Sequence, residues 1–144
     1  GGLMDRGNKY IKGGKDGNQY LSWSAGAPGG DQFDDGRKWA VWSDKKDTAI
    51  TIAADGGVES TDLNMYLGWS AGTPGATLED GRKWAVWGPT SDASFSTGKL
   101  LGGTGGAQYL SWSNGFGDAK AFDDDNNRVY AAWQDGEAPA SISS

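Results

Sequence analysis

Acidic side chains, arginines and tryptophans recur together at three places in this 144-residue chain. A carboxylate can accept two hydroxyl groups and a guanidinium can donate from the opposite side, while a flat aromatic ring packs on the apolar C–H patch of a polyol. The combination therefore indicates shallow binding sites for a neutral, hydroxyl-rich ligand. The predicted ligand-binding residues are Asp35, Arg37, Trp42 and Trp23, then Asp80, Arg82, Trp87 and Trp69, and finally Asp124, Arg128, Trp133 and Trp112.

Each of these features also has a purely structural interpretation. Asp and Gly residues form turns, and an aspartate two or four residues before an arginine can make an ion pair that only fixes the turn. Trp23, Trp69 and Trp112 either extend a core or emerge at the end of a strand. The sequence leaves both interpretations open.

The recurrence comes from an internal repeat. The segment Tyr20–Gly26 reads YLSWSAG, and close copies of it start at Tyr66 and Tyr109, at offsets of 46 and 43 residues. An acidic turn follows each copy, and a segment of the type Arg-Lys-Trp-Ala-Val-Trp follows each turn. A period of this size is typical of repeat architectures.

Each repeat holds four short segments, most of them rich in aromatic or β-branched residues and bounded by turn residues, as strands are. No window shows the spacing of an amphipathic helix. We therefore predict a single all-β domain over residues 1–144, with repeats at about 1–54, 55–97 and 98–144 and twelve strands in all. Three four-stranded repeats with pseudo-threefold symmetry favour a β-trefoil, and a three-sheet β-prism is the main alternative, because propellers typically need at least four blades.

Strand alternation assigns faces to these segments. Leu21, Leu67 and Leu110 are expected to fill the barrel. In the second segment Trp39 and Val41 share one face, and Ala40 and Trp42 share the other. We expect the Trp39 face to be buried, which predicts that Trp42, Trp87 and Trp133 point outward.

Composition excludes several classes of function. The chain has no cysteine and no histidine, so thiolate chemistry and the commonest general base are missing. The formal charge of -6 argues against a nucleic-acid partner. No run approaches the ~20 apolar residues of a membrane span, so we expect a soluble protein, cytoplasmic or secreted, without membrane insertion. We expect no cofactor and no metal, because the oxygen-rich turn at 123–127 lacks the Gly and Glu of an EF-hand.

The chain resembles the β-trefoil lectins, which include ricin-B-type and fungal fruit-body lectins. The resemblance rests on three copies that cover nearly the whole chain, on the Gly-x-x-Tyr-Leu motifs at 17–21 and 106–110, and on the acidic turns and Trp-bearing strands. The resemblance implies a non-enzymatic protein with up to three similar sugar sites, which would recognise glycans multivalently and could agglutinate cells. The Gln-x-Trp signature of the ricin-B type is absent. The ricin-type galactose site is therefore not carried over to this chain.

Two other readings remain open. A protein-binding β-trefoil, such as a protease inhibitor or a cytoskeletal partner, would use a loop that breaks the repeat, at 43–47 or 114–118. Alternatively, the symmetry is only a scaffold without retained sites. Catalysis is not expected, because no histidine can activate a serine and because active sites are normally single within a domain.

Overall fold

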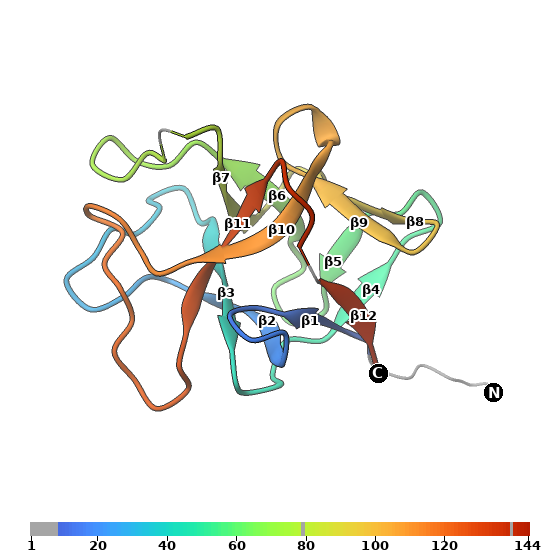
Figure 1. Cartoon of the computed structure of the whole chain (residues 1–144), viewed down its shortest axis with the longest axis horizontal. Coiled ribbons are helices and arrows are strands. Elements are labelled where there is room, and N and C mark those ends of the chain that lie inside the picture. Colours follow the sequence, from blue (N-terminus) through green and yellow to red (C-terminus); the bar gives the residue numbers. More distant parts are fainter. Residues whose placement is uncertain (1–8, 79, 139) are drawn as a thin grey trace.

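The computed structural model describes residues 9–78, 80–138 and 140–144, and it is all-β (Figure 1). Twelve strands are present, as the sequence predicts, and no α-helix occurs in the described part of the chain. The first repeat contains β1 (Tyr10–Gly13), β2 (Gln19–Ser24), β3 (Lys38–Ser43) and β4 (Ile50–Ile52); the second contains β5 (Val58–Ser60), β6 (Tyr66–Ser70), β7 (Lys83–Gly88) and β8 (Ser94–Ser96); the third contains β9 (Lys99–Gly102), a short 3-10 helix (Thr104–Gly106), β10 (Gln108–Ser113), β11 (Val129–Gln134) and β12 (Ser141–Ser143).

The strands form three antiparallel arms. In order from the centre outward, the arms are β3-β2-β1-β12, β7-β6-β5-β4 and β11-β10-β9-β8. The outermost strand of each arm comes from the preceding repeat in cyclic order. Every repeat therefore contributes strands to two arms, which ties the repeats together.

The three innermost strands pair with one another and nearly close the sheet into a barrel. The start of β3 pairs with the end of β7 (Lys38 opposite Trp87), and the start of β11 pairs with the end of β3 (Val129 opposite Trp42). The start of β7 pairs with the end of β11 (Lys83 opposite Trp133). Each inner strand thus has a different neighbour along each half of its length.

One face of these three strands lies in the main hydrophobic core. Trp42, Trp87 and Trp133 are fully buried there and pack with the leucines of β2, β6 and β10. The predicted role of Leu21, Leu67 and Leu110 as core residues is confirmed. The prediction that Trp42, Trp87 and Trp133 point outward is wrong.

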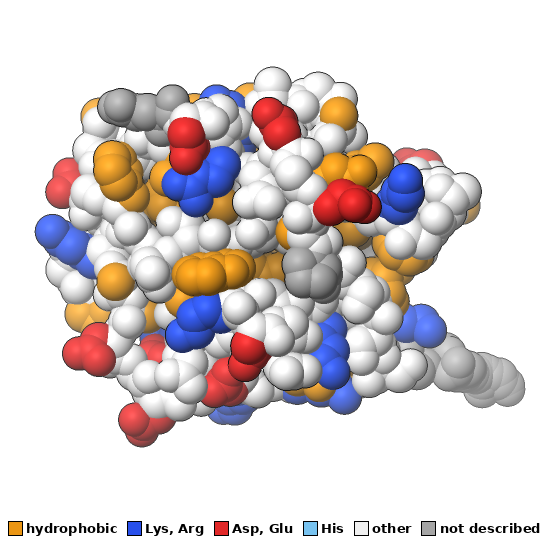
Figure 2. Space-filling model, viewed as in Figure 1, with side chains coloured by type: hydrophobic (Ala, Val, Ile, Leu, Met, Phe, Trp, Pro, Cys, Tyr) orange, Lys and Arg blue, Asp and Glu red, His pale blue; other side chains and the backbone are white. Residues whose placement is uncertain are grey.

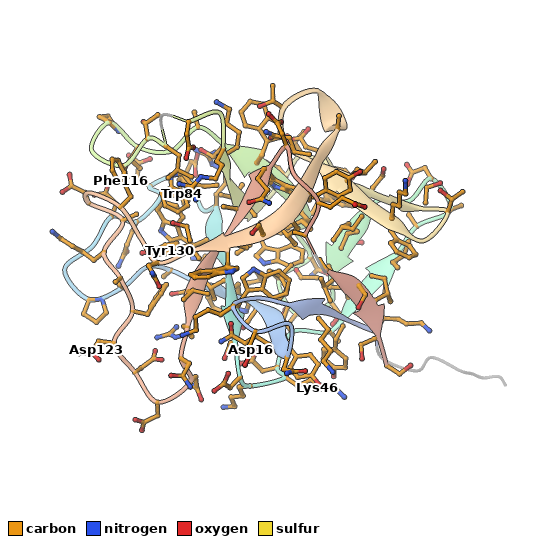
Figure 3. The ribbon with its side chains drawn as sticks, viewed as in Figure 1. Asp16, Lys46, Trp84, Phe116, Asp123 and Tyr130 are labelled. Atoms are coloured by element: carbon orange, nitrogen blue, oxygen red, sulfur yellow. The ribbon has the colours of Figure 1, made fainter. Side chains whose placement is uncertain are left out.

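The opposite face is buried as well, which is why the outward prediction failed. Trp39, Trp84 and Tyr130 form a second core with Val41 and Val86. Three long loops (25–37, 71–82 and 114–128) cover this side and supply further apolar side chains, among them Ala76, Leu78, Ala119, Phe33 and Phe122. In Figure 3, Trp84 and Tyr130 lie on the side of the molecule from which the long loops extend. A strand with two covered faces carries large apolar residues on both.

Both sets of aromatic residues donate hydrogen bonds to the backbone. The indole Nε1 of Trp42 donates to Ser111 O (3.0 Å), that of Trp87 to Ser22 O (3.1 Å) and that of Trp133 to Gly68 O (3.1 Å). Each of these bonds runs from one repeat to the preceding one. On the other face, Trp39, Trp84 and Tyr130 donate to Asp31 O, Ala76 O and Lys120 O, in the middle of the covering loops.

The tryptophans also explain two glycines at strand ends. A Cβ at Gly13 would lie 2.9 Å from the ring of Trp42, and one at Gly102 would lie 2.7 Å from the ring of Trp133. A side chain at either position would displace the ring, since such distances are shorter than van der Waals contact.

We predict that Trp87→Ala lowers the free energy of unfolding by about 3–5 kcal/mol, because it removes a buried side chain and leaves Ser22 O without its donor. Urea unfolding followed by far-UV circular dichroism measures this loss. The exposed Thr51→Ala on β4 is the control and should change stability by less than about 0.5 kcal/mol. An equally small effect of Trp87→Ala would contradict the central packing role of this ring.

Tyr130 provides a second test of the covered face. Burial raises the pKa of its phenol to about 12. A folded pKa above the unfolded value of about 10 means that the stabilisation is complete below pH ~10 and is lost as the pH rises toward 12. The stability of the wild-type protein should therefore fall more steeply than that of Tyr130→Phe between about pH 10 and 12 in urea titrations. Parallel curves would place Tyr130 in a solvated environment.

Candidate functional site

The three acidic turns make three ion pairs. Arg37 Nε donates to both carboxylate oxygens of Asp35 (3.0 and 3.2 Å), and Arg82 Nε does the same with Asp80 (2.9 and 3.0 Å). In the third repeat Arg128 Nε donates to Asp124 across a turn that is two residues longer. The guanidinium groups of Arg37 and Arg128 also stack on Phe33 and Phe122. The structural interpretation of these residues is therefore realised in every repeat.

The pairs affect how the carboxylates titrate. Hydrogen bonds from Arg37 and Arg82 hold the pKa of Asp35 and that of Asp80 below the ordinary value for aspartate. For Asp124, partial burial acts to raise the pKa, but the hydrogen bond and charge of Arg128 outweigh it, and the pKa is lowered. All three carboxylates are thus charged at neutral pH.

Trp23, Trp69 and Trp112 are partly exposed at the edge of the main core. Trp23 Nε1 donates to Asp62 Oδ2 (3.2 Å), and the Lys38 ammonium lies 5.9 Å from the centre of its ring. Lys83 has the same relation to Trp69, at 6.0 Å. These three rings are the tryptophans that a ligand can reach, since the other five are buried.

The most complete group of predicted site residues surrounds a hollow of about 340 Å³ beside Trp69. Asp35 and Arg37 line one side, Gly68 and Trp69 of β6 line another, and Thr90 and Asp92 after β7 complete the wall together with Val86, Gly88 and Pro89. The hollow thus combines a flat apolar ring with two carboxylates and a guanidinium.

The hollow joins two repeats, whereas the sequence-based prediction placed each site within one repeat. The cause is the pairing of Lys38 with Trp87, which brings the end of the first acidic turn against the end of β7. A Cβ at Gly88 would lie 3.0 Å from Arg37 Cγ, so the stem of this arginine runs directly across the glycine.

Departures from the repeat give this junction a different lining from the other two. Gly68 and Gly88 stand where the first repeat has Ser22 and Ser43 and the third has Ser111 and Gln134. Ser22 Oγ donates to Asp47 Oδ1 (2.6 Å), whereas Gly68 has no group that could bond to Asp92. The glycines leave room between β6, β7 and the first acidic turn.

A second substitution acts at the same junction. Gln19 Nε2 donates to Asn127 O (2.8 Å), and Gln108 Nε2 donates to Gly81 O (3.0 Å). These two bonds tie the third and second acidic turns to the neighbouring repeat. Met65 occupies the corresponding position in the second repeat, and a methionine side chain cannot donate such a bond.

Trp112 lines another hollow, of about 330 Å³. Lys15, Asp16 and Glu137 contribute charged groups to it, and Ser111 and the glycines of the β1–β2 turn complete much of the wall. In Figure 3, Asp16 lies in the turn between β1 and β2, away from the three long loops. Asp80, Arg82, Asp124 and Arg128 line neither this hollow nor the one at Trp69.

The structure thus brings together Asp35, Arg37 and Trp69 among the predicted residues. It adds Thr90, Asp92, Asp16 and Glu137, which the sequence reasoning missed. Glycine at 68 and 88, where the other repeats have larger side chains, is the sequence signal that could have revealed the hollow between the first acidic turn and the second repeat. Nothing in the repeat pattern marks Asp16 or Glu137.

Other ligand types find little support in the described residues. No three histidine, cysteine, aspartate or glutamate side chains in that part of the chain are grouped so that they could hold a metal ion. On the face shown in Figure 2, basic and acidic side chains are interspersed, and hydrophobic side chains surface in separate small groups. No helix in ranges 9–78, 80–138 and 140–144 is long and apolar enough to cross a membrane.

No protein-family model, curated protein sequence or solved structure significantly matches this chain.

The three ion pairs predict a specific response to acid. Because the folded pKa values of Asp35, Asp80 and Asp124 are depressed, the pairs stabilise the fold above pH ~4 and lose this contribution as the pH falls through the folded values. The difference in unfolding free energy between the wild type and a variant with all three aspartates changed to Asn should shrink below pH 4. Urea titrations at pH 2.5 to 7 measure it, and a constant difference would contradict the prediction.

Proposed function

We propose that this chain is a non-enzymatic carbohydrate-binding protein with the β-trefoil fold. The three arms around a ring of paired inner strands, with each arm drawn from two consecutive repeats, support the fold assignment. The hollow at Trp69 is the observation that carries the function. It places a partly exposed indole beside Asp35, Arg37 and Asp92, a small number of polar groups around a flat apolar wall.

The chemistry of the hollow fits a sugar ring. The C–H face of a pyranose packs on an indole, and its hydroxyl groups donate to carboxylates. Arg37 uses Nε for the pair with Asp35, and its terminal amino groups are further potential donors. The ion pair holds both charged groups in place before a ligand arrives, which reduces the entropy lost on binding.

The hollow at Trp112 offers a second, differently lined site for the same ligand class. Binding at each shallow site alone is expected to be weak. Two or more sites on one molecule would raise the avidity for a surface that carries many glycans, and agglutination would follow from such multivalent binding.

A glycan array with labelled protein tests the proposal. We expect binding to one glycan class, unchanged by EDTA because no metal is required. A blank array from protein shown to be folded would reject carbohydrate binding.

Variants locate the site. Trp69→Ala should weaken binding of the preferred glycan at least about tenfold, which corresponds to ~1.4 kcal/mol. Trp23→Ala is the matched control in the first repeat, and binding should stay within about twofold of the wild type.

Asp35→Ala should weaken binding as much as the triple replacement of Asp35, Asp80 and Asp124 by Ala. Full binding by a folded triple variant would remove the acidic turns from the site.

One observation favours a protein partner as the second candidate function. Phe116 is 48% exposed at the tip of the loop 114–118, the segment that breaks the repeat. Backbone bonds between Phe116 and Ala119 and between Asp118 and Gly75 hold this loop, and Figure 3 shows Phe116 at the margin of the molecule. An exposed aromatic side chain on a fixed loop is typical of interface contacts. A blank glycan array would make this loop the next candidate.

A further inference from the structure

Asp92 is the polar group of the Trp69 hollow whose bonding differs from that of its counterpart in the first repeat. Its side chain is half-buried, and its backbone N–H donates to Leu67 O (3.3 Å), which fixes the residue beside β6. In the described part of the chain, no side chain donates a hydrogen bond to its carboxylate. Asp47, which occupies a similar place in the first repeat, is bonded by both Ser22 and Thr48.

Gly68 is the cause of this difference. A Cβ at Gly68 would lie 3.1 Å from both Asp92 Oδ2 and Thr90 O, so a serine requires these neighbours to move by a few tenths of an ångström. Its hydroxyl would then reach the Asp92 carboxylate as Ser22 reaches Asp47. With glycine, the carboxylate faces the hollow and keeps its full capacity to accept hydrogen bonds.

The charges that line the hollow do not cancel. Asp35 and Arg37 neutralise each other as an ion pair in which Nε donates to both carboxylate oxygens, whereas Asp92 adds a further negative charge. A carboxylate beside an indole is a favourable environment for a cation, which gains both a charge-assisted hydrogen bond and contact with the ring. The Lys83 ammonium lies 6.0 Å from the centre of the Trp69 ring, so this indole already has one cation near it within the chain.

We infer that the hollow at Trp69 selects a sugar that carries an ammonium group, and that Asp92 is the residue that determines this selectivity. The inference rests on the proposed carbohydrate-binding function. The ammonium donates to Asp92, the C–H face of the same sugar packs on Trp69, and the ring hydroxyls bond to Asp35 and Arg37. A free amino sugar, as in de-acetylated polymers of glucosamine, has this chemistry, whereas an N-acetylated sugar lacks the charge.

The test compares glucosamine with glucose and N-acetylglucosamine at pH 6, where the amine is protonated because α-amino groups titrate at about 7.7. Binding is measured from the shift of the Trp69 indole N–H signal in NMR titrations. We expect glucosamine to bind about five- to tenfold more tightly than glucose. Asp92→Asn keeps the shape of the side chain and should abolish this preference while glucose still binds. Asp47→Asn is the matched control and should leave the preference unchanged.

A second variant occupies the Asp92 carboxylate with a hydrogen bond and leaves the residue itself unchanged. Gly68→Ser should bond to Asp92 and lower the preference for glucosamine to less than about twofold. Near-UV circular dichroism identifies any variant that fails to fold, and either variant alone is sufficient for the test.

The outcomes separate the inference from the function on which it rests. Equal or tighter binding of glucose, or a preference that survives in folded Asp92→Asn, would overturn the inference and leave carbohydrate binding in place. Absence of any sugar-dependent shift in the folded wild-type protein would overturn both.

Discussion

Donation of hydrogen bonds by buried aromatic side chains to backbone carbonyls is the interaction on which this fold depends. An indole buried without a partner would lose the free energy of its bond to water, so each buried ring must end beside an acceptor. Trp42, Trp87 and Trp133 find that acceptor in the preceding repeat. Three equivalent bonds therefore fix the repeats relative to one another in both distance and rotation. The rings on the opposite face attach the long loops in the same way, and these loops carry the acidic turns.

The hollow at Trp69 coincides with a local loss of that regularity. In the first and third repeats a glutamine is bonded to an acidic turn, whereas the second repeat has Met65 at this position. The second repeat also has Gly68 and Gly88 where the others have hydroxyl or amide side chains. Gly68 and Gly88 line the hollow beside Trp69 without side chains of their own, and Met65 lacks the amide that bonds to an acidic turn in the other repeats. A symmetric scaffold can accommodate such losses at one junction, because the cores and the other two junctions maintain the barrel.

Much of the fold could be predicted from the sequence, because the repeat and the strand alternation are local properties. The segments around Leu21, Leu67 and Leu110 form the expected strands, and these leucines fill the core. The buried state of Trp42 could not be predicted, because alternation separates two faces without revealing that both are covered. The Trp42 face lies in the main core, and the long loops cover the Trp39 face. The meeting of Asp35 with Trp69 depends on which repeats are neighbours at each edge, and this is set by the pairing of β3 with β7. Asp92 acquires its importance only through the missing side chain of Gly68, a residue distant from it in sequence.

The pairing of β12 with β1 has a consequence for how such a molecule can be assembled. Beside β1, β12 occupies the place that β4 occupies beside β5 and that β8 occupies beside β9. At two of these equivalent places the paired strands follow each other directly along the chain, and at the third they come from its first and third repeats. Peptide continuity between repeats is therefore not required for the pairing itself. Three separate copies of a single-repeat polypeptide would together contain every strand and every indole donor between repeats. They could therefore form the same barrel as a homotrimer. Fusion into one chain then allows one junction to diverge while the other two preserve the assembly.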